Sequence, residues 1–343
     1  MKRIRYFDLL RCISFCFIIF YHMIIQLHIS EICQLESITP FFMNQNMHIA
    51  TLGVAVFFML SGASLGYTTR EKFDIKKYYK KRFLRILIPF YIAYLICLVM
   101  LIGINHSIHG VFPENVPVWR FVFTVLGMDG WISGHGIATF FLGPGEWFLG
   151  CLMVLYLVFP LLRYLMRKNK WLFFAAATGI YLLVIWNYRF PIEEHQNLLL
   201  KGYEFIIGMM IGYCGAEFRS KWKYLTIPVV IFFLISPFEI KIDYELKITI
   251  LAVAFFLSFS YLEPVLQKRK CSVSDILSRY SYEIFLIHHV IICFLTPKLK
   301  PYLQNTGMIL VLFAAEILII AIAGFVLKFI SDRCIKLLAQ KRS

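Results

Sequence analysis

Three ionisable residues interrupt the first apolar run of the chain, a run long enough to cross a membrane. They are Asp8, Arg11 and His22, in the sequence FDLLRCISFCFIIFYH. A charged side chain in the bilayer interior costs at least about 2.5 kcal/mol, so each one calls for a partner or a function. His22 offers a Brønsted base near neutral pH. Arg11 is a fixed cation that can hold an anionic group.

The spacing of Arg11 and His22 predicts that both project from one stripe of a helix. Eleven residues make three helical turns, which leaves the two side chains about 20° apart around the axis and about 16 Å apart along it. Ser14 and Gln26 share this stripe. The alternative is structural, with Asp8 and Arg11 paired near the membrane surface and His22 bonded to a neighbouring helix. We favour that alternative for Asp8, and a functional role for the Arg11 and His22 stripe.

The composition of the chain requires a membrane to surround these residues. Of 343 residues, 60% are hydrophobic, 17% are aromatic and only 16% are charged, and the mean hydropathy is +0.72. Such a chain is neither a soluble globular protein nor a fibrous, disordered or disulfide-framework protein. Apolar runs near the length needed to cross the hydrocarbon predict ten transmembrane helices, at about 7–29, 49–67, 83–104, 147–166, 171–189, 198–216, 223–238, 246–262, 281–297 and 308–332.

The distribution of positive charge predicts the orientation of these spans. The net charge is +15, and Lys and Arg concentrate in the two tails and the even-numbered loops. Because cytoplasmic loops carry the excess of Lys and Arg, we expect both termini to be cytoplasmic. The charges lie in loops rather than on one nucleic-acid-binding face, so no nucleic acid partner is expected. The fold class is therefore an all-α, polytopic integral membrane protein, expected to form one domain over 1–343 without an appended soluble domain.

A basic segment at 68–85 precedes the third apolar run. Binding of anionic lipid headgroups best explains four lysines of this segment. They are Lys76, Lys77, Lys80 and Lys81. Arg82 and Arg85 differ because they lie three residues apart, at neighbouring positions of one helix face that enters the membrane boundary. This arrangement suits a clamp on the phosphates of a cytoplasmic cosubstrate. Lipid phosphate is the alternative ligand.

Further ionisable residues lie inside later spans. Glu283, His288 and His289 fall in YSYEIFLIHHV, and adjacent histidines on a helix point about 100° apart, so they cannot readily chelate one ion. We interpret them as packing and hydrogen-bonding groups that line a cavity. Glu204 and Glu316 lie mid-span, where we expect them to be neutral or paired. The nine cysteines show no metal-ligand spacing, and no metal is expected.

Several segments in order resemble the membrane-bound acyltransferase family 3. FDLLRCISFCFIIFYH resembles the family's first helix, in which ten residues separate an Arg from a His. The other segments that resemble the family are GVAVFFMLSG (53–62), KRFLRILIPFY (81–91), EWFLGCLMVLYLVFP (146–160) and SYEIFLIHH (281–289). Together they span nearly the whole chain.

The resemblance implies transfer of an acyl group, usually acetyl from acetyl-CoA, to a hydroxyl of a capsular or other cell-surface polysaccharide or its lipid-linked precursor. It implies a bacterial inner or plasma membrane. Carried over residue by residue, His22 matches the catalytic His, Arg11 its paired Arg, and Arg82 and Arg85 the cytoplasmic Arg pair. We therefore expect His22 and Arg11 at the catalytic centre, and Arg82, Arg85 and Arg11 at the acyl-CoA. Succinyl is an alternative acyl group, and direct transfer and an acyl-His intermediate both stay open.

The segment that begins at Glu146 departs from the family pattern. Many glycan-modifying members carry a Glu after the Trp, whereas here Gly150 and Cys151 follow Leu149 and the Glu precedes Trp147. No catalytic role is therefore assigned to Glu146. The rival functional class is a transporter or flippase of envelope glycan precursors, in which the charged stripe would be a proton or anion pathway.

Overall fold

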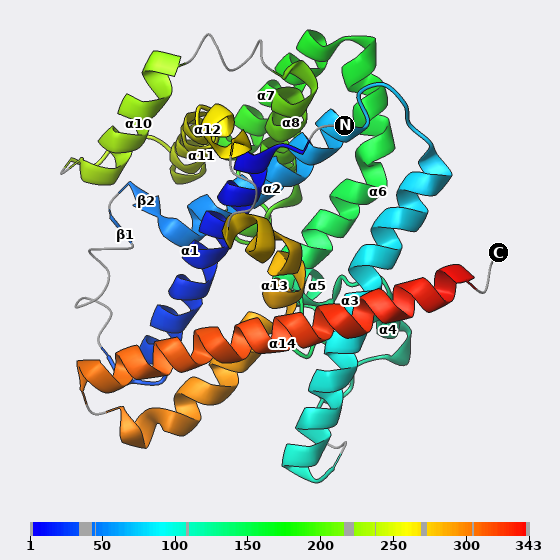
Figure 1. Ribbon diagram of the computed structural model, residues 1–343, viewed down its shortest axis with the longest axis vertical. Coiled ribbons are helices and arrows are strands. Elements are labelled where there is room, and N and C mark those ends of the chain that lie inside the picture. The colour runs from blue at the N-terminus through cyan, green and yellow to red at the C-terminus, as the bar shows by residue number, and fades with distance from the viewer. Residues whose placement is uncertain are drawn as a thin grey trace. The chain divides into compact units, whose positions relative to one another are not determined.

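The computed structural model confirms that all ten predicted apolar runs are helical (Figure 1). It describes residues 3–33, 43–44, 46–107, 110–215, 223–236, 238–268, 273–303 and 305–340. The corresponding helices are α1 (Arg5–Ile29), α2 (Ile49–Thr68), α3 (Ile75–Asn105), α6 (Glu146–Lys168), α7 (Lys170–Trp186), α8 (Leu198–Cys214), α10 (Lys223–Ile235), α11 (Tyr244–Ser260), α13 (Val273–Leu299) and α14 (Thr306–Gln340).

Short elements occupy some of the predicted loops. The long segment 105–146, predicted as a loop, contains η3 (Val118–Arg120), α4 (Phe121–Val125) and α5 (Asp129–Gly134). A two-stranded antiparallel hairpin pairs β1 (Met43–Asn44) with β2 (Met47–His48) ahead of α2. The remaining short helices are η4 (Glu194–Gln196), α12 (Glu263–Gln267) and η5 (Lys300–Tyr302).

Helix length and apolar content confirm the membrane-protein class. Within the described ranges, six helices are long and apolar enough to cross a membrane, and they are α1, α2, α3, α6, α13 and α14. Helices α7 and α10 are apolar but shorter. Of the six, α2 is the most buried and α14 the least, so α14 offers the most surface to lipid. The number of ten spans and the cytoplasmic termini stay predictions.

The chain divides into two compact units, each built from separate stretches of sequence. Unit 1 comprises Met1–Tyr21, Gln34–Phe73 and Val158–Arg279. Unit 2 comprises His22–Cys33, Asp74–Leu157 and Tyr280–Ser343. Helices α1, α6 and α13 each contribute to both units, and we describe each unit by itself.

Unit 1 is built on the close packing of α2 against α8. Gly62 of α2 and Gly208 of α8 lie at this contact, and a Cβ at either position would overlap a backbone carbonyl oxygen, of Phe205 and Met59 respectively. Small residues at a helix contact let membrane helices approach this closely, which maximises van der Waals contact. Fully buried side chains such as Phe256 extend the core of this unit to α11.

Unit 2 contains the contact between α3 and α14 and the first turns of α6. The carboxylate of Asp74 caps α3 by accepting a hydrogen bond of 2.9 Å from the backbone N–H of Lys77. Helix α13 is tied to α3 by the hydroxyl of Tyr282, which donates to the carbonyl oxygen of Ile86 at 2.9 Å. This unit also contains the end of α1 from His22 onward, the start of α6 and the greater part of α13.

Candidate active site

Unit 2 brings four ionisable side chains together, which we call the acid–base cluster: His22, Glu146, His288 and His289. The Nε2 atom of His22 lies 3.6 Å from Oε2 of Glu146. Oε1 of Glu146 lies 3.7 Å from Nε2 of His288 and 3.6 Å from Nδ1 of His289. The ring centroid of His22 is 5.1 Å from that of His288 and 4.6 Å from that of His289. One carboxylate thus faces three imidazoles.

The protonation pattern of His288 is set by the backbone. Its Nδ1 lies 2.7 Å from the carbonyl oxygen of Phe285, which can only accept, so Nδ1 carries the proton. The Nε2 lone pair of the neutral ring then points toward Glu146. His288 is 1% exposed, and neither its Nε2 nor Oε1 of Glu146 has a hydrogen-bond partner among the described residues.

The backbone holds Glu146 in an unusual conformation. Glu146 begins α6 with φ of +42°, a left-handed value that costs a non-glycine residue roughly 1–2 kcal/mol. Gly130 of α5 packs directly on the peptide of Glu146, and a Cβ at that position would overlap the Glu146 carbonyl group. Next to this turn, the rings of Phe148 and Phe285 pack edge to face with centroids 5.0 Å apart. The segment 105–146 therefore positions the carboxylate.

Sequence reasoning assigned no catalytic role to Glu146 and interpreted His288 and His289 as packing and hydrogen-bonding groups, and the structure places all three beside His22. The signal that could have indicated Glu146 is a carboxylate at the start of an apolar span, directly after the turn Gly143-Pro144-Gly145. Glu146 precedes Trp147, and this order does not match the family pattern. Only the fold shows that this carboxylate reaches the first helix.

The cluster has the composition of an acid–base centre and of a metal site. His22, Glu146 and His288 are the one group in the described part of the chain whose ligand atoms approach closely enough to hold an ion, all within 4.8 Å of one another. Two His and one Glu are a common ligand set for catalytic Zn²⁺. His289 does not join that group, in agreement with the expectation that adjacent histidines do not chelate one ion. The absence of a metal requirement stays a prediction.

Arg11 lies in unit 1, in the N-terminal half of α1. Its Nη1 is 3.2 Å from Oδ1 of Asp8, and Nε of Arg3 is 2.7 Å from the other oxygen. The ion pair between Asp8 and Arg11 is therefore confirmed. Arg11 also lines a cavity of about 250 Å³ together with Ser64 and Tyr67. Helix α1 is continuous through Arg11 and His22, but these residues belong to different units, so their common lining of one cavity stays a prediction.

The two arginines of α3 differ in their surroundings. The guanidinium of Arg82 is half-buried and lies over the ring of Tyr156, 5.0 Å from its centroid. Arg85 is exposed. The aromatic contact therefore orients Arg82, whereas Arg85 lies at the surface. A phosphate clamp formed by both residues stays a prediction.

The other buried carboxylates have their own partners. Lys201 is completely buried, and its Nζ lies 2.8 Å from Glu204 and 3.0 Å from Glu245. Glu316 accepts a hydrogen bond of 2.7 Å from Thr296. Such pairing lowers the cost of burying ionisable groups, as expected for Glu204 and Glu316. These residues lie outside the acid–base cluster.

The fold and the cluster define a polytopic helical membrane protein with a buried acid–base centre. Comparison with known families adds the identity: the family model described as "Acyltransferase domain" matches residues 4–330. The chain therefore belongs to the membrane-bound acyltransferase family 3, as its motifs indicated.

Comparison with individual proteins gives a partial match. The chain is similar to acyltransferase MdmB of Streptomyces mycarofaciens, with 32% identity over 126 residues. That alignment covers 36% of this chain and 31% of the relative, so it spans about a third of either protein. No solved structure matches the chain.

Proposed function

We propose that this protein is an O-acyltransferase of the bacterial inner membrane that moves acetyl from acetyl-CoA to a hydroxyl of a cell-surface polysaccharide or its lipid-linked precursor. Family membership over residues 4–330 and the similarity to acyltransferase MdmB support acyl transfer. The donor, the acceptor and the membrane are inferred from the family resemblance of the sequence motifs. The ten spans with cytoplasmic termini would let the donor bind from the cytoplasm.

The observation that carries this proposal is the 3.6 Å contact between His22 Nε2 and Glu146 Oε2. A carboxylate beside Nε2 favours the tautomer with the proton on Nε2, which makes Nδ1 the basic atom. In the proposed reaction the acceptor hydroxyl gives its proton to Nδ1 while its oxygen attacks the thioester carbonyl. The carbon–sulfur bond then breaks, and the imidazolium returns the proton to the sulfur of coenzyme A. Glu146 stabilises the imidazolium between these steps.

The proposed donor contacts use the cationic residues at the cytoplasmic side. Coenzyme A carries several phosphates on a long arm, and guanidinium groups bind phosphate through paired hydrogen bonds. Arg82, held over Tyr156, and the exposed Arg85 lie in the first turns of α3. Arg11 lines the cavity of unit 1 and is the third proposed donor contact.

Acetyl-CoA labelled in the acetyl group tests the proposal with the full chain in vesicles. Wild-type protein is expected to release coenzyme A and label an envelope glycan extract, and His22→Gln is expected to lose at least about 100-fold in rate while keeping its thermal unfolding curve. Acetyl transfer by folded His22→Gln at the wild-type rate would refute the mechanism. Glycan movement across the vesicle without acetyl transfer would identify a transporter instead. Glycan NMR of a strain lacking the protein identifies the sugar and the hydroxyl.

A further inference from the structure

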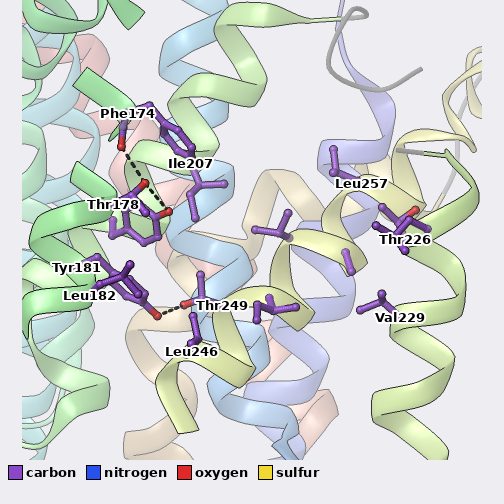
Figure 2. Close-up of a pocket in the computed structure, with 15 residues that line it drawn as sticks. Phe174, Thr178, Tyr181, Leu182, Ile207, Thr226, Val229, Leu246, Thr249 and Leu257 are labelled. Carbon is purple, nitrogen blue, oxygen red and sulfur yellow. Dashed lines mark hydrogen bonds between the residues drawn. The ribbon is translucent and has the colours of Figure 1, made fainter. Parts of the chain in front are cut away.

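A second cavity, of about 340 Å³, lies in unit 1 between α7, α8, α10 and α11, and none of the residues assigned to acyl transfer lines it (Figure 2). Aromatic and aliphatic side chains supply most of its wall. They include Phe174, Tyr203, Ile207, Val229, Val253 and Leu257. Its volume lies in the range of ligand sites, which are roughly 300–1,000 Å³.

The hydroxyl groups on the α7 side of the cavity are already satisfied by one another. Thr178 donates to the carbonyl oxygen of Phe174 at 2.8 Å and lies 3.0 Å from the hydroxyl of Tyr203. The hydroxyl of Tyr181 lies 2.8 Å from that of Thr249, and Figure 2 shows both contacts as dashed lines. These hydroxyl groups therefore need no hydrogen bond from a ligand. A hydrocarbon chain fits such a wall, whereas a polar ligand would lose hydrogen bonds to water.

Thr226 of α10 differs from these residues. It lines the same cavity and is only 5% exposed, yet its hydroxyl has no hydrogen-bond partner among the described residues. Leaving a buried hydroxyl unpaired costs about 1–3 kcal/mol. An ester carbonyl of a ligand, which accepts a hydrogen bond, would remove that cost.

The sequence around this end of the cavity is strongly basic. Thr226 lies in the first turn of α10, three residues after Lys223, where the sequence reads Lys221-Trp222-Lys223-Tyr224-Leu225. Phe174 lies in the first turns of α7, which follows Arg167 and Lys168 and begins at Lys170. Basic clusters at the end of a membrane helix attract anionic lipid headgroups. In the sequence, Thr226 and the basic residues therefore both fall at helix starts.

The outer surfaces beside the cavity are apolar. Leu183 of α7 is 61% exposed and Ile231 of α10 is 50% exposed. In a membrane protein such surfaces contact lipid chains, so lipid is the molecule present at high concentration next to the cavity. Together these observations point to a lipid rather than to a water-soluble ligand.

We propose that the cavity between α7, α8, α10 and α11 binds one acyl chain of an anionic phospholipid. The ester carbonyl accepts a hydrogen bond from Thr226, and the phosphate lies at the basic start of α7. No bond is made or broken, and the lipid is a resident ligand of unit 1. This site is independent of acyl transfer.

Photochemical labelling in vesicles tests the position of the chain. The full protein is reconstituted in phosphatidylcholine and phosphatidylglycerol at four to one, with a diazirine on the acyl chains of the phosphatidylglycerol, and adducts are located by peptide mass spectrometry. We expect adducts at Val229 and Ile207, and at least a fivefold loss of both when Val253→Trp fills the cavity. The matched control Ile231→Trp, on the outer face of α10, should leave them unchanged.

Equal labelling of wild type and folded Val253→Trp would overturn the proposal, as would labelling confined to outward-facing residues such as Leu183. If Val253→Trp does not fold, Val229→Phe fills the same space from α10 and decides the question. Absence of adducts at Ile207 in both wild type and Val229→Phe counts against the proposal.

Native mass spectrometry tests the headgroup and Thr226. Delipidated protein is titrated with phosphatidylglycerol or phosphatidylcholine, and we expect preferential retention of the anionic lipid. Thr226→Val should weaken that retention about three- to tenfold, and Thr226→Ser should restore it, because only the hydroxyl donates. Equal retention of both lipids, or no effect of Thr226→Val, would overturn the proposal. Neither readout uses acetyl-CoA, so its failure is distinct from failure of the proposed acyl transfer.

Discussion

His22 and Glu146 face each other across unit 2, with Nε2 of the imidazole 3.6 Å from Oε2 of the carboxylate. The first residue comes from the C-terminal half of α1 and the second from the strained first position of α6. This contact gives the histidine of the family motif a partner that its own helix does not supply. It also makes Glu146 the residue on which the first prediction rests.

Glu146→Gln is predicted to lower kcat for acetyl transfer by roughly 10²–10⁴, because the amide neither selects the tautomer of His22 nor stabilises its charged form. Initial rates with labelled acetyl-CoA measure this effect. Glu114→Gln, an exposed change in the segment that precedes α6, is the matched control and should keep the wild-type rate. A folded Glu146→Gln protein with unchanged kcat would show that the carboxylate is structural.

Removal of the ring beneath Arg82 is predicted to weaken donor binding. A cation–π contact contributes about 0.5–2 kcal/mol, so Tyr156→Leu should raise the KM for acetyl-CoA by roughly 2–30-fold with a smaller effect on kcat. Tyr156→Phe keeps the aromatic face and should behave like wild type. The steady-state dependence of rate on acetyl-CoA concentration separates the two variants. If both raise KM equally, the hydroxyl rather than the ring is what matters.

The three side chains that could hold an ion lead to a prediction about chelation. In the proposed reaction Nε2 of His22 carries a proton toward Glu146, and a Zn²⁺ bound between these residues would have to replace that proton. We therefore expect the purified protein to retain full activity after treatment with a chelator, and to contain less than about 0.1 equivalent of zinc by elemental analysis. Stoichiometric zinc that disappears in Glu146→Gln, together with loss of activity on chelation, would replace the proposed base by a metal-bound nucleophile.

The buried carboxyl of Asp129 is predicted to make the folded state less stable as the pH rises. Asp129 begins α5, outside the six candidate spans, and burial raises its pKa from 3.8 to about 6, against a smaller lowering by Thr124. A raised pKa means that the folded state holds this proton more tightly than the unfolded state. The associated stability is fully present below pH 4 and is lost as the pH rises through about 6.

Asp129→Asn should therefore raise the unfolding temperature by a few degrees at pH 7.5 and have little effect at pH 4.5. A shift of about two pKa units corresponds to roughly 3 kcal/mol at most. Tryptophan fluorescence during heating at several pH values measures this difference. An equal shift at both pH values would point to packing rather than to the proton.

The contact of α2 with α8 predicts a strong effect of side-chain size at Gly208. Gly208→Leu places atoms on the Met59 backbone and should separate the helices, at a cost of roughly 3 kcal/mol or more. Gly179→Leu in α7 is the control, because a Cβ there meets no atom within 4 Å. Size-exclusion chromatography in detergent should show aggregation for the first variant only. A monodisperse, thermally unchanged Gly208→Leu protein would contradict the observed packing.

The amino-acid sequence by itself determined the helices of this protein. Each predicted apolar run is helical because a backbone in lipid must satisfy its own hydrogen bonds, and a run of apolar side chains suffices to indicate where that occurs. Charge within an apolar run is rare, which sufficed to select Arg11 and His22 as candidates. The three-residue spacing of Arg82 and Arg85 selected that pair. The same local pattern supported the family, which the comparison confirmed. The ion pair of Arg11 with Asp8 was predictable because both residues lie one turn apart on one helix.

Tertiary structure decided which groups surround His22. Glu146 and His288 are distant from it in sequence, and helical periodicity carries no information about the packing of one helix on another. The left-handed φ of Glu146 depends on the turn before it and on Gly130, which lies in a segment that sequence reasoning treated as a loop. The cavity between α7, α8, α10 and α11 likewise arises only where four helices meet, and it is there that the Thr226 hydroxyl has no partner among the described residues. Chemistry here depends on contacts between elements, and such contacts are set by the packing of side chains rather than by any single segment.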